Sequence, residues 1–251
     1  MLEVPLTMHK IIILVPFRNV RPYIIDCINS IIGQHYNNYE VFLLDDASDD
    51  GTLDLIDGEV EKFHRVRNKK RLGLMENIYK ALMELPIKDE DIVIQLDGDD
   101  YLLGEYVLQI INATYDSNTL LSYGQFIDNY GRMGFCSPYS KEEFASIRSV
   151  RWKASHIKTF KYKLFKAFLR QDPHCENLKT ETGQFYEYAS DIALMFPLME
   201  IAGFENTAMI QNIVYCYRRH PNNDGASTVG RQLQLDVENA IRNRTPLKRM
   251  F

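Results

Sequence analysis

The sequence predicts an α/β fold whose mostly parallel sheet is flanked by helices and followed by an α+β half. Short apolar runs rich in β-branched residues, at 11–15, 41–44 and 92–96, lack polar alternation, which is typical of strands covered on both faces. Stripes of apolar residues at helical spacing, over 24–32 and 74–85, predict two intervening helices. With a weaker strand near Val66, the order is β-α-β-α-(β)-α-β, and right-handed crossovers give a doubly wound sheet.

Helix and strand signals continue less regularly after Asp100. Residues 103–111 predict a helix, 120–133 a hairpin turning near 129–131, and 213–217 a final strand. The segment 148–166 has no clean period and is interpreted as a loop plus a short helix. An apolar stripe over 192–202 predicts a late helix interrupted at Pro197 and stopped at Gly203. We expect one domain over 1–251, divided into residues 1–101, 102–241 and a basic tail over 242–251 that can be loose.

Composition limits the class of protein. The 251 residues are 45% hydrophobic and 25% charged, which suits a globular chain with a full core. A net charge of -5 argues against a generic nucleic-acid binder. No apolar run reaches the roughly 20 residues of a membrane span, and no signal sequence is recognisable, so a cytoplasmic location is expected. Four scattered cysteines without a C-x-x-C pair predict reduced, structural thiols.

Three polar clusters follow predicted strands and therefore meet at one edge of the sheet, where open α/β sheets bind ligands. They are residues 16–19, 45–51 and 97–100. No glycine-rich dinucleotide or phosphate loop is present, so bound phosphate would need a metal. Asp97, Asp99 and Asp100 provide the hard oxygen ligands that Mg²⁺ or Mn²⁺ prefers. A solvated acidic turn is the alternative interpretation.

The first hundred residues contain a series of motifs in order: Val15-Pro-Phe-Arg-Asn19, Ser30-Ile-Ile-Gly-Gln34, a segment from Tyr39 to Thr52 with Asp45-Asp-Ala-Ser-Asp-Asp-Gly51, and Leu96-Asp-Gly-Asp-Asp100. Together they resemble the family 2 glycosyltransferases, which have a GT-A fold. The resemblance implies inverting transfer of a sugar from a nucleotide-sugar donor, usually UDP-linked, with Mn²⁺ or Mg²⁺. The implied acceptor is a glycan, a lipid-linked molecule or a protein, with peripheral membrane contact allowed and no nucleic-acid partner.

The resemblance also assigns roles on the donor side. Asp45 or Asp46 would hold the uracil or ribose, Asp99 the ribose, and Asp100 the metal on the diphosphate. The metal ligands it implies are Asp99, Asp100 and His220. The full set of implied nucleotide-sugar contacts is Pro16, Arg18, Asn19, Asp45, Asp46, Asn68, Arg71, Gly73, Asp97, Gly98 and Asp99.

Resemblance in the second half is weaker. Asp191, at the start of the late helix, stands where the family keeps its catalytic base, although Ser190 replaces the acidic residue that often precedes it. A first-turn acid that complements the helix dipole is the alternative. Arg218, Arg219 and His220 resemble a late segment that meets the diphosphate and metal. Trp152 is either a sugar platform or a buried anchor, and His156 either contacts donor phosphate or is structural.

Three other interpretations stay open. Residues 46–57 nearly fit an EF-hand calcium loop, but the preceding residues predict a strand, Asp57 replaces the usual glutamate and no partner loop is present. A sugar-nucleotide pyrophosphorylase would need a glycine-rich N-terminal loop that residues 16–19 lack. A catalytically inactive sugar-binding relative is the third.

Overall fold

The computed structural model describes residues 7–56, 61–223 and 227–251. The described residues form an eight-stranded sheet. Its strands are β1 (Ile11–Phe17), β2 (Tyr39–Asp45), β3 (Phe63–Arg67), β4 (Ile92–Gln95), β5 (Tyr101–Leu102), β6 (Leu121–Asp128), β7 (Ser155–Lys161) and β8 (Thr207–Tyr217). The α-helices are α1 (Ile24–Ile32), α2 (Leu74–Glu84), α3 (Val107–Thr114), α4 (Lys141–Ala145), α5 (Tyr162–Gln171), α6 (Ser190–Ala202) and α7 (Thr228–Arg242).

Strand order across the sheet is β3-β2-β1-β4-β7-β6-β8-β5. Strands β3, β2, β1 and β4 run parallel to one another, and β7 pairs with β4 in the antiparallel direction. The predicted parallel, doubly wound half is therefore confirmed. Strands β2 and β3 lie on one side of β1, and β4 lies on the other, so the strand order reverses between β1 and β4. Ligands bind at such switch points in α/β folds.

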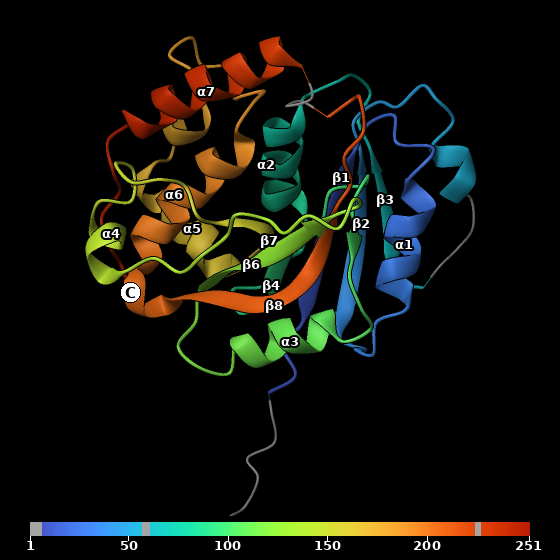
Figure 1. Ribbon diagram of the computed structural model, residues 1–251, viewed down its shortest axis with the longest axis horizontal. Helices are drawn as coiled ribbons and strands as arrows, with labels where there is room; N and C mark the ends of the chain where they lie inside the picture. The colour runs from blue at the N-terminus through green and yellow to red at the C-terminus, as the bar shows by residue number, and fades with distance from the viewer. Residues whose placement is uncertain (1–6, 57–60, 224–226) are drawn as a thin grey trace, which may run out of the picture.

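The core lies on both faces of the sheet. Along β1, Ile12 and Leu14 pack with α2, α5 and α6, whereas Ile11, Ile13 and Val15 pack with α1 and α3. Figure 1 shows α2, α5 and α6 gathered on one side of the strands and α1 on the other. Burial on both faces explains why these strands are continuously apolar rather than alternating.

Several predictions for the second half are wrong. The segment 148–166 contains the central strand β7 and the start of α5 rather than a loop and a short helix. The predicted hairpin over 120–133 has only β6, followed by a turn and one bridge between Ile127 and Met133, because β6 pairs with β7 and β8 instead. The last strand begins at Thr207, well before 213.

The two predicted helices of this half also differ in detail. Helix α3 begins at Val107 because β5 and Gly104 occupy the preceding residues. Helix α6 continues through Pro197 to Ala202. Proline removes one N–H donor, and the apolar packing that buries nearly every residue of this helix holds it together.

The basic tail, which was expected to be loose, is hydrogen-bonded to the rest of the chain. Arg244 Nη2 donates to the Lys179 carbonyl at 2.7 Å, and the amide of Met250 donates to the Ile201 carbonyl at 3.0 Å. Tail residues therefore cover α6 and the segment before it. In the described part of the chain, no helix is long and apolar enough to cross a membrane.

Candidate functional site

A cavity of about 350 Å³ lies beyond the carboxyl ends of β1, β2 and β4, at the predicted edge of the sheet. Its lining from the first half of the chain includes Pro16, Arg18, Asp46, Arg71, Gly73, Asn77, Asp97, Asp99 and Asp100. Its lining from the second half includes His156, Lys158, Glu187, Tyr188, Asp191 and Tyr217. The structure thus brings together most of the polar residues that the sequence singled out.

The turn after β4 is fixed tightly against the end of β1. The amide of Gly98 donates to the Pro16 carbonyl at 3.1 Å, and a Cβ at position 98 would lie 2.6 Å from the Cβ of Phe17. Glycine is therefore required by this close approach. Asp100 is held on both oxygens, since Oδ2 accepts from the Tyr215 hydroxyl at 2.6 Å and Oδ1 from the Arg218 amide at 2.7 Å.

Negative charge is concentrated on this turn. Burial, followed by the charges of Asp99 and Asp97, raises the pKa of Asp100 well above its ordinary value. Burial also raises the pKa of Asp97, while the charge of Lys158 opposes that shift. A divalent cation placed among these carboxylates would reverse both shifts, because it stabilises the ionised forms.

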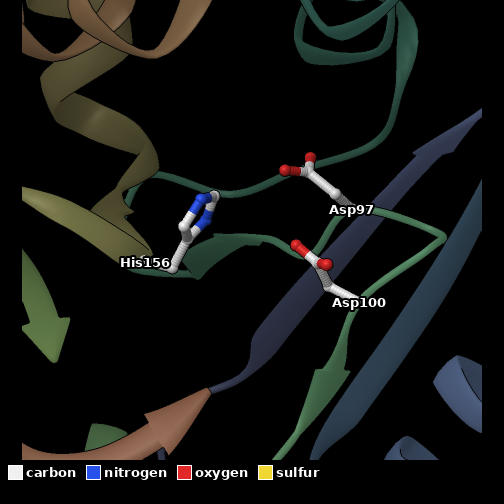
Figure 2. Close-up of side chains that lie close together, drawn as sticks. All are labelled: Asp97, Asp100 and His156. Carbon is white, nitrogen blue, oxygen red and sulfur yellow. The ribbon is translucent and has the colours of Figure 1, made fainter. Parts of the chain in front are cut away.

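Two sets of candidate metal ligands meet at the turn. Asp97, Asp100 and His156 have ligand atoms that all lie within 4.8 Å of one another, and Figure 2 shows the three side chains pointing toward a common space. Burial lowers the pKa of His156 well below its ordinary value, and its Nδ1 has no hydrogen-bond partner within the described structure. Of the metal ligands that the resemblance implies, Asp99 and His220 lie together, with His220 Nε2 2.9 Å from Asp99 Oδ2, but among the described residues His220 is not part of a group of three close ligand atoms.

His156 is held by aromatic neighbours rather than by hydrogen bonds. Its ring stacks on Tyr215, with centroids 4.5 Å apart, and on Tyr217 at 5.5 Å. A neutral imidazole in this position keeps a lone pair available for a cation.

Asp191 lies in the first turn of α6 and borders two cavities. One is the cavity just described. The other, of about 1000 Å³, is lined by Phe126, Tyr130, Phe135, Arg219, Arg231 and further residues of the second half. The carboxylate therefore stands where the contents of the two cavities would meet.

Comparison with known proteins assigns the family. The model of glycosyl transferase family 2 matches residues 12–175, which is well over half of the chain. The chain belongs to glycosyl transferase family 2. The resemblance carried by the motifs of the first hundred residues is thereby confirmed, and the EF-hand interpretation falls, because the strand β2 precedes the loop where an EF-hand needs a helix. Asp57 of that loop lies outside the described residues.

Two curated relatives match about half of this family 2 chain. A protein of Haemophilus influenzae described as an uncharacterized glycosyltransferase is 25% identical over 126 residues, 48% of this chain and 48% of that protein. Glycosyltransferase GlyA of Streptococcus pneumoniae is 26% identical over 119 residues, 47% of this chain and 17% of that protein. The matched segments thus span less than half of either relative.

Solved structures extend the likeness to nearly the whole chain. S. aureus TarS in complex with UDP-GlcNAc has a TM-score of 0.62 at 17% identity, covering 93% of this chain and 69% of that one. The mannosyltransferase PcManGT from Pyrobaculum calidifontis, in complex with GDP-Man and Mn²⁺, has a TM-score of 0.64 at 17% identity, covering 96% and 66%. These likenesses show that the family 2 chain has the expected GT-A fold.

The two acidic residues after β2 occupy different environments. Asp46 lines the cavity of about 350 Å³ and accepts from the backbone amides of Leu72 at 2.7 Å and Gly73 at 2.9 Å, so it holds the loop before α2. Asp45 is buried outside that lining, where Oδ1 caps the Ser48 amide at 2.9 Å and Oδ2 lies 3.2 Å from Arg67 Nε. Of the pair, Asp46 is the one placed to meet a ligand.

Other predicted donor contacts divide into lining and supporting residues. Arg18 lines the cavity while its Nη1 donates to the Asp46 and Ala47 carbonyls. Asn19 exchanges hydrogen bonds with Asp49 and lies outside the lining, as does Asn68, which donates to Asn77 at 2.9 Å. The last two therefore shape the loops around the cavity.

Predicted residues of the second half also separate. Trp152 is a buried anchor, since it packs against Phe196 in the core and lines neither cavity described above. Arg218 also lies outside both linings, where it binds the Asp99 carbonyl at 2.9 Å and Asp26 at 2.8 Å and so supports the turn. Arg219 lines the larger cavity and pairs with Asp128 at 2.7 Å.

Several residues that line the cavity have no clear signal in the sequence. Lys158 comes from β7, the strand that was interpreted as a loop, and Gln234 comes from α7, which was not predicted. Glu187 and Tyr188 precede α6. Only the position of Asp191 could have indicated the last two, because residues just before a site helix commonly face the same crevice.

Proposed function

We propose that this chain is an inverting glycosyltransferase that moves a sugar from a nucleotide-diphosphate donor, a UDP-sugar, to an acceptor hydroxyl with the help of Mn²⁺ or Mg²⁺. The observation that carries the proposal is one cavity bordered by the carboxylate turn 97–100 at one side and by Asp191 at the other. Support for the donor class comes from family 2 membership and from the GT-A neighbours solved with UDP-GlcNAc and with GDP-Man.

The place of Asp191, which lines both cavities, supports a single displacement with Asp191 as the base. An acceptor hydroxyl in the larger cavity attacks the anomeric carbon while the bond from that carbon to the diphosphate oxygen breaks. Asp191 takes the hydroxyl proton, and the bonding electron pair leaves with the nucleotide diphosphate. Attack from the face opposite the leaving group inverts the anomeric configuration.

The candidate metal ligands around the turn 97–100 suit a hard divalent cation. Carboxylates with raised pKa values and an imidazole without a partner on Nδ1 are the ligands such a cation would use. Asp100 lies with Asp97 and His156 in the set that the structure brings together, and the resemblance implies a second set of Asp99, Asp100 and His220, of which Asp99 and His220 lie 2.9 Å apart. Bound there, Mn²⁺ or Mg²⁺ would stabilise the charge that develops on the diphosphate.

In this proposal the two halves of the chain contact different parts of the reacting molecules. Residues 1–101 bind the nucleotide, and residues 102–241 supply the base and the acceptor cavity. The sugar lies between them.

Removing the metal should weaken nucleotide binding. Calorimetry with UDP and Mn²⁺ should show an affinity that EDTA lowers strongly, and Asp100→Ala should reproduce the loss because it removes the ligand common to both sets. His156→Gln and His220→Gln then separate the two sets. Only the substitution of a true metal ligand should reduce the dependence of UDP affinity on Mn²⁺. An affinity for UDP that is the same with and without EDTA would contradict metal assistance. A protein that binds neither UDP nor GDP would be an inactive relative.

Asp46→Ala should weaken donor binding. Loss of a charged acceptor that also positions the 72–73 amides is expected to cost about 1–3 kcal/mol of donor affinity. Asp45→Ala is the matched control, because that carboxylate is one residue away and faces the protein interior. We expect it to lower the melting temperature more than the donor affinity. Equal donor affinity in both variants and the native protein would remove Asp46 from the site.

A further inference from the structure

Lys158 is a buried cation on the floor of the donor cavity. It lies on β7 opposite Gln95 of β4 and Tyr123 of β6, so strands flank it on both sides. Only 4% of the residue is exposed, yet it lines the cavity together with Asp97 and Asp191. A lysine is rarely buried to this extent without a paired anion.

Among the described residues, none forms a hydrogen bond with the Lys158 ammonium or an ion pair with it within 4.0 Å, although the backbone of Lys158 pairs with both neighbouring strands. Lys161, three residues along the same strand, is buried to 8% exposure and pairs with Glu90 at 2.9 Å. The ammonium is not one of the fully buried polar atoms without a partner, so it reaches the cavity that Lys158 lines, and its three N–H donors are open to partners there. The cavity is the place from which such partners can come.

The electrostatic surroundings define the chemistry of that partner. Asp97 and Asp191 line the same cavity as Lys158, so two carboxylates border the space that the ammonium faces. Two carboxylates outweigh the charge of one ammonium. A further anion would add uncompensated negative charge, whereas neutral hydroxyl oxygens would satisfy the N–H donors.

The position of Lys158 relates it to one part of the donor. Asp97 belongs to the turn assigned to the diphosphate, and Asp191 is the proposed base that faces the anomeric carbon. What lies between these two residues in a bound donor is the transferred sugar. We propose that the Lys158 ammonium hydrogen-bonds hydroxyl oxygens of a neutral transferred sugar and thereby selects the donor. This inference rests on the proposed function.

Paired binding measurements test it. Calorimetry with Mn²⁺ would use UDP-glucose, UDP-GlcNAc, UDP-glucuronic acid and GDP-mannose, each beside its parent diphosphate. In Lys158→Met, the affinity for the sugar nucleotide should fall by roughly tenfold or more, while the affinity for the parent diphosphate changes by less than about twofold. Lys161→Met is the matched control and should leave both affinities unchanged. Lys158→Gln, which keeps N–H donors, should recover part of the loss.

The outcomes separate the two proposals. If no nucleotide binds the native protein, the proposed function itself fails and this inference falls with it. If nucleotides bind and Lys158→Met weakens diphosphate and sugar nucleotide equally, the lysine binds phosphate and the inference is overturned. It is also overturned if neither affinity changes, or if the native protein prefers the uronic acid donor. Melting curves of each variant confirm that a folded protein was measured.

Discussion

Replacing Asp191 by asparagine should lower kcat by on the order of 10²–10⁴, the usual contribution of general base catalysis. Asparagine keeps the size of the side chain and cannot take the proton of the acceptor hydroxyl. Affinity for the donor should stay close to that of the native protein, because Asp191 also borders the larger cavity, which is the proposed acceptor site. The rate is measured as release of the nucleotide diphosphate from the donor that binds most tightly. Either water or an added acceptor serves as the second substrate.

The helix-dipole role of Asp191 makes the opposite prediction. Under that interpretation the asparagine variant keeps most of its turnover and loses at most a few tenths of a kcal/mol of stability. Glu187→Gln is the matched control, since Glu187 is another acid that lines the same cavity. A similar loss of rate in both variants would point to the general charge of the cavity, and turnover near the native value would exclude Asp191 as the base.

The donor side could be predicted from sequence because two simple rules agree there. Buried parallel strands have continuous apolar runs, as in residues 11–15 and 41–44, and parallel strands place the residues that follow them at one edge. Helices α1 and α2 were predicted because each keeps an apolar stripe toward the sheet. The clusters after β1, β2 and β4 therefore came together as expected.

Strand β7 was not predictable by the same rules, because its sequence has functional and structural polar residues where the core rule expects apolar ones. His156 and Lys158 face the cavity, and Lys161 is buried with a salt bridge to Glu90. Within β7, only Ile157 and Phe160 are apolar residues packed in the core. The residues that make this strand part of the site thus also conceal it as a strand.

The roles of Trp152 and Arg218 show a second limit. Residue type suggests a diphosphate contact for the guanidinium of Arg218 and leaves Trp152 open between a sugar platform and a buried anchor. Burial shows that Trp152 is a core residue, and Arg218 supports the turn 97–100 through two hydrogen bonds to Asp99 and Asp100, while a third joins it to Asp26 of α1. Which of these functions a side chain performs depends on tertiary contacts that the sequence pattern does not specify.

Arg148 is the centre of a buried polar network that joins α6, α7 and the tail. Its Nε and Nη2 donate to Glu200 at 2.5 and 2.9 Å, and Nη1 donates to the Ile241 carbonyl at 2.8 Å. The same Glu200 accepts from the Leu247 amide at 2.9 Å. The two side chains are only 6% and 8% exposed, so either one alone would be an unpaired buried charge.

Arg148→Met should therefore lower the free energy of unfolding by about 3–5 kcal/mol, because Glu200 and the helix-end carbonyl would lose their donor. For a chain of this size, that corresponds to roughly 6–20 °C in melting temperature. Lys141→Met is the control: its salt bridge to Glu205 at 3.1 Å is exposed and should contribute less than about 1 kcal/mol. Arg148→Met with Glu200→Leu should recover part of the loss, since no charge stays buried. Denaturant unfolding of the four proteins measures these differences, and a cost for Arg148→Met no larger than that of the surface control would show that the network does not stabilise the packing of α6 against the tail.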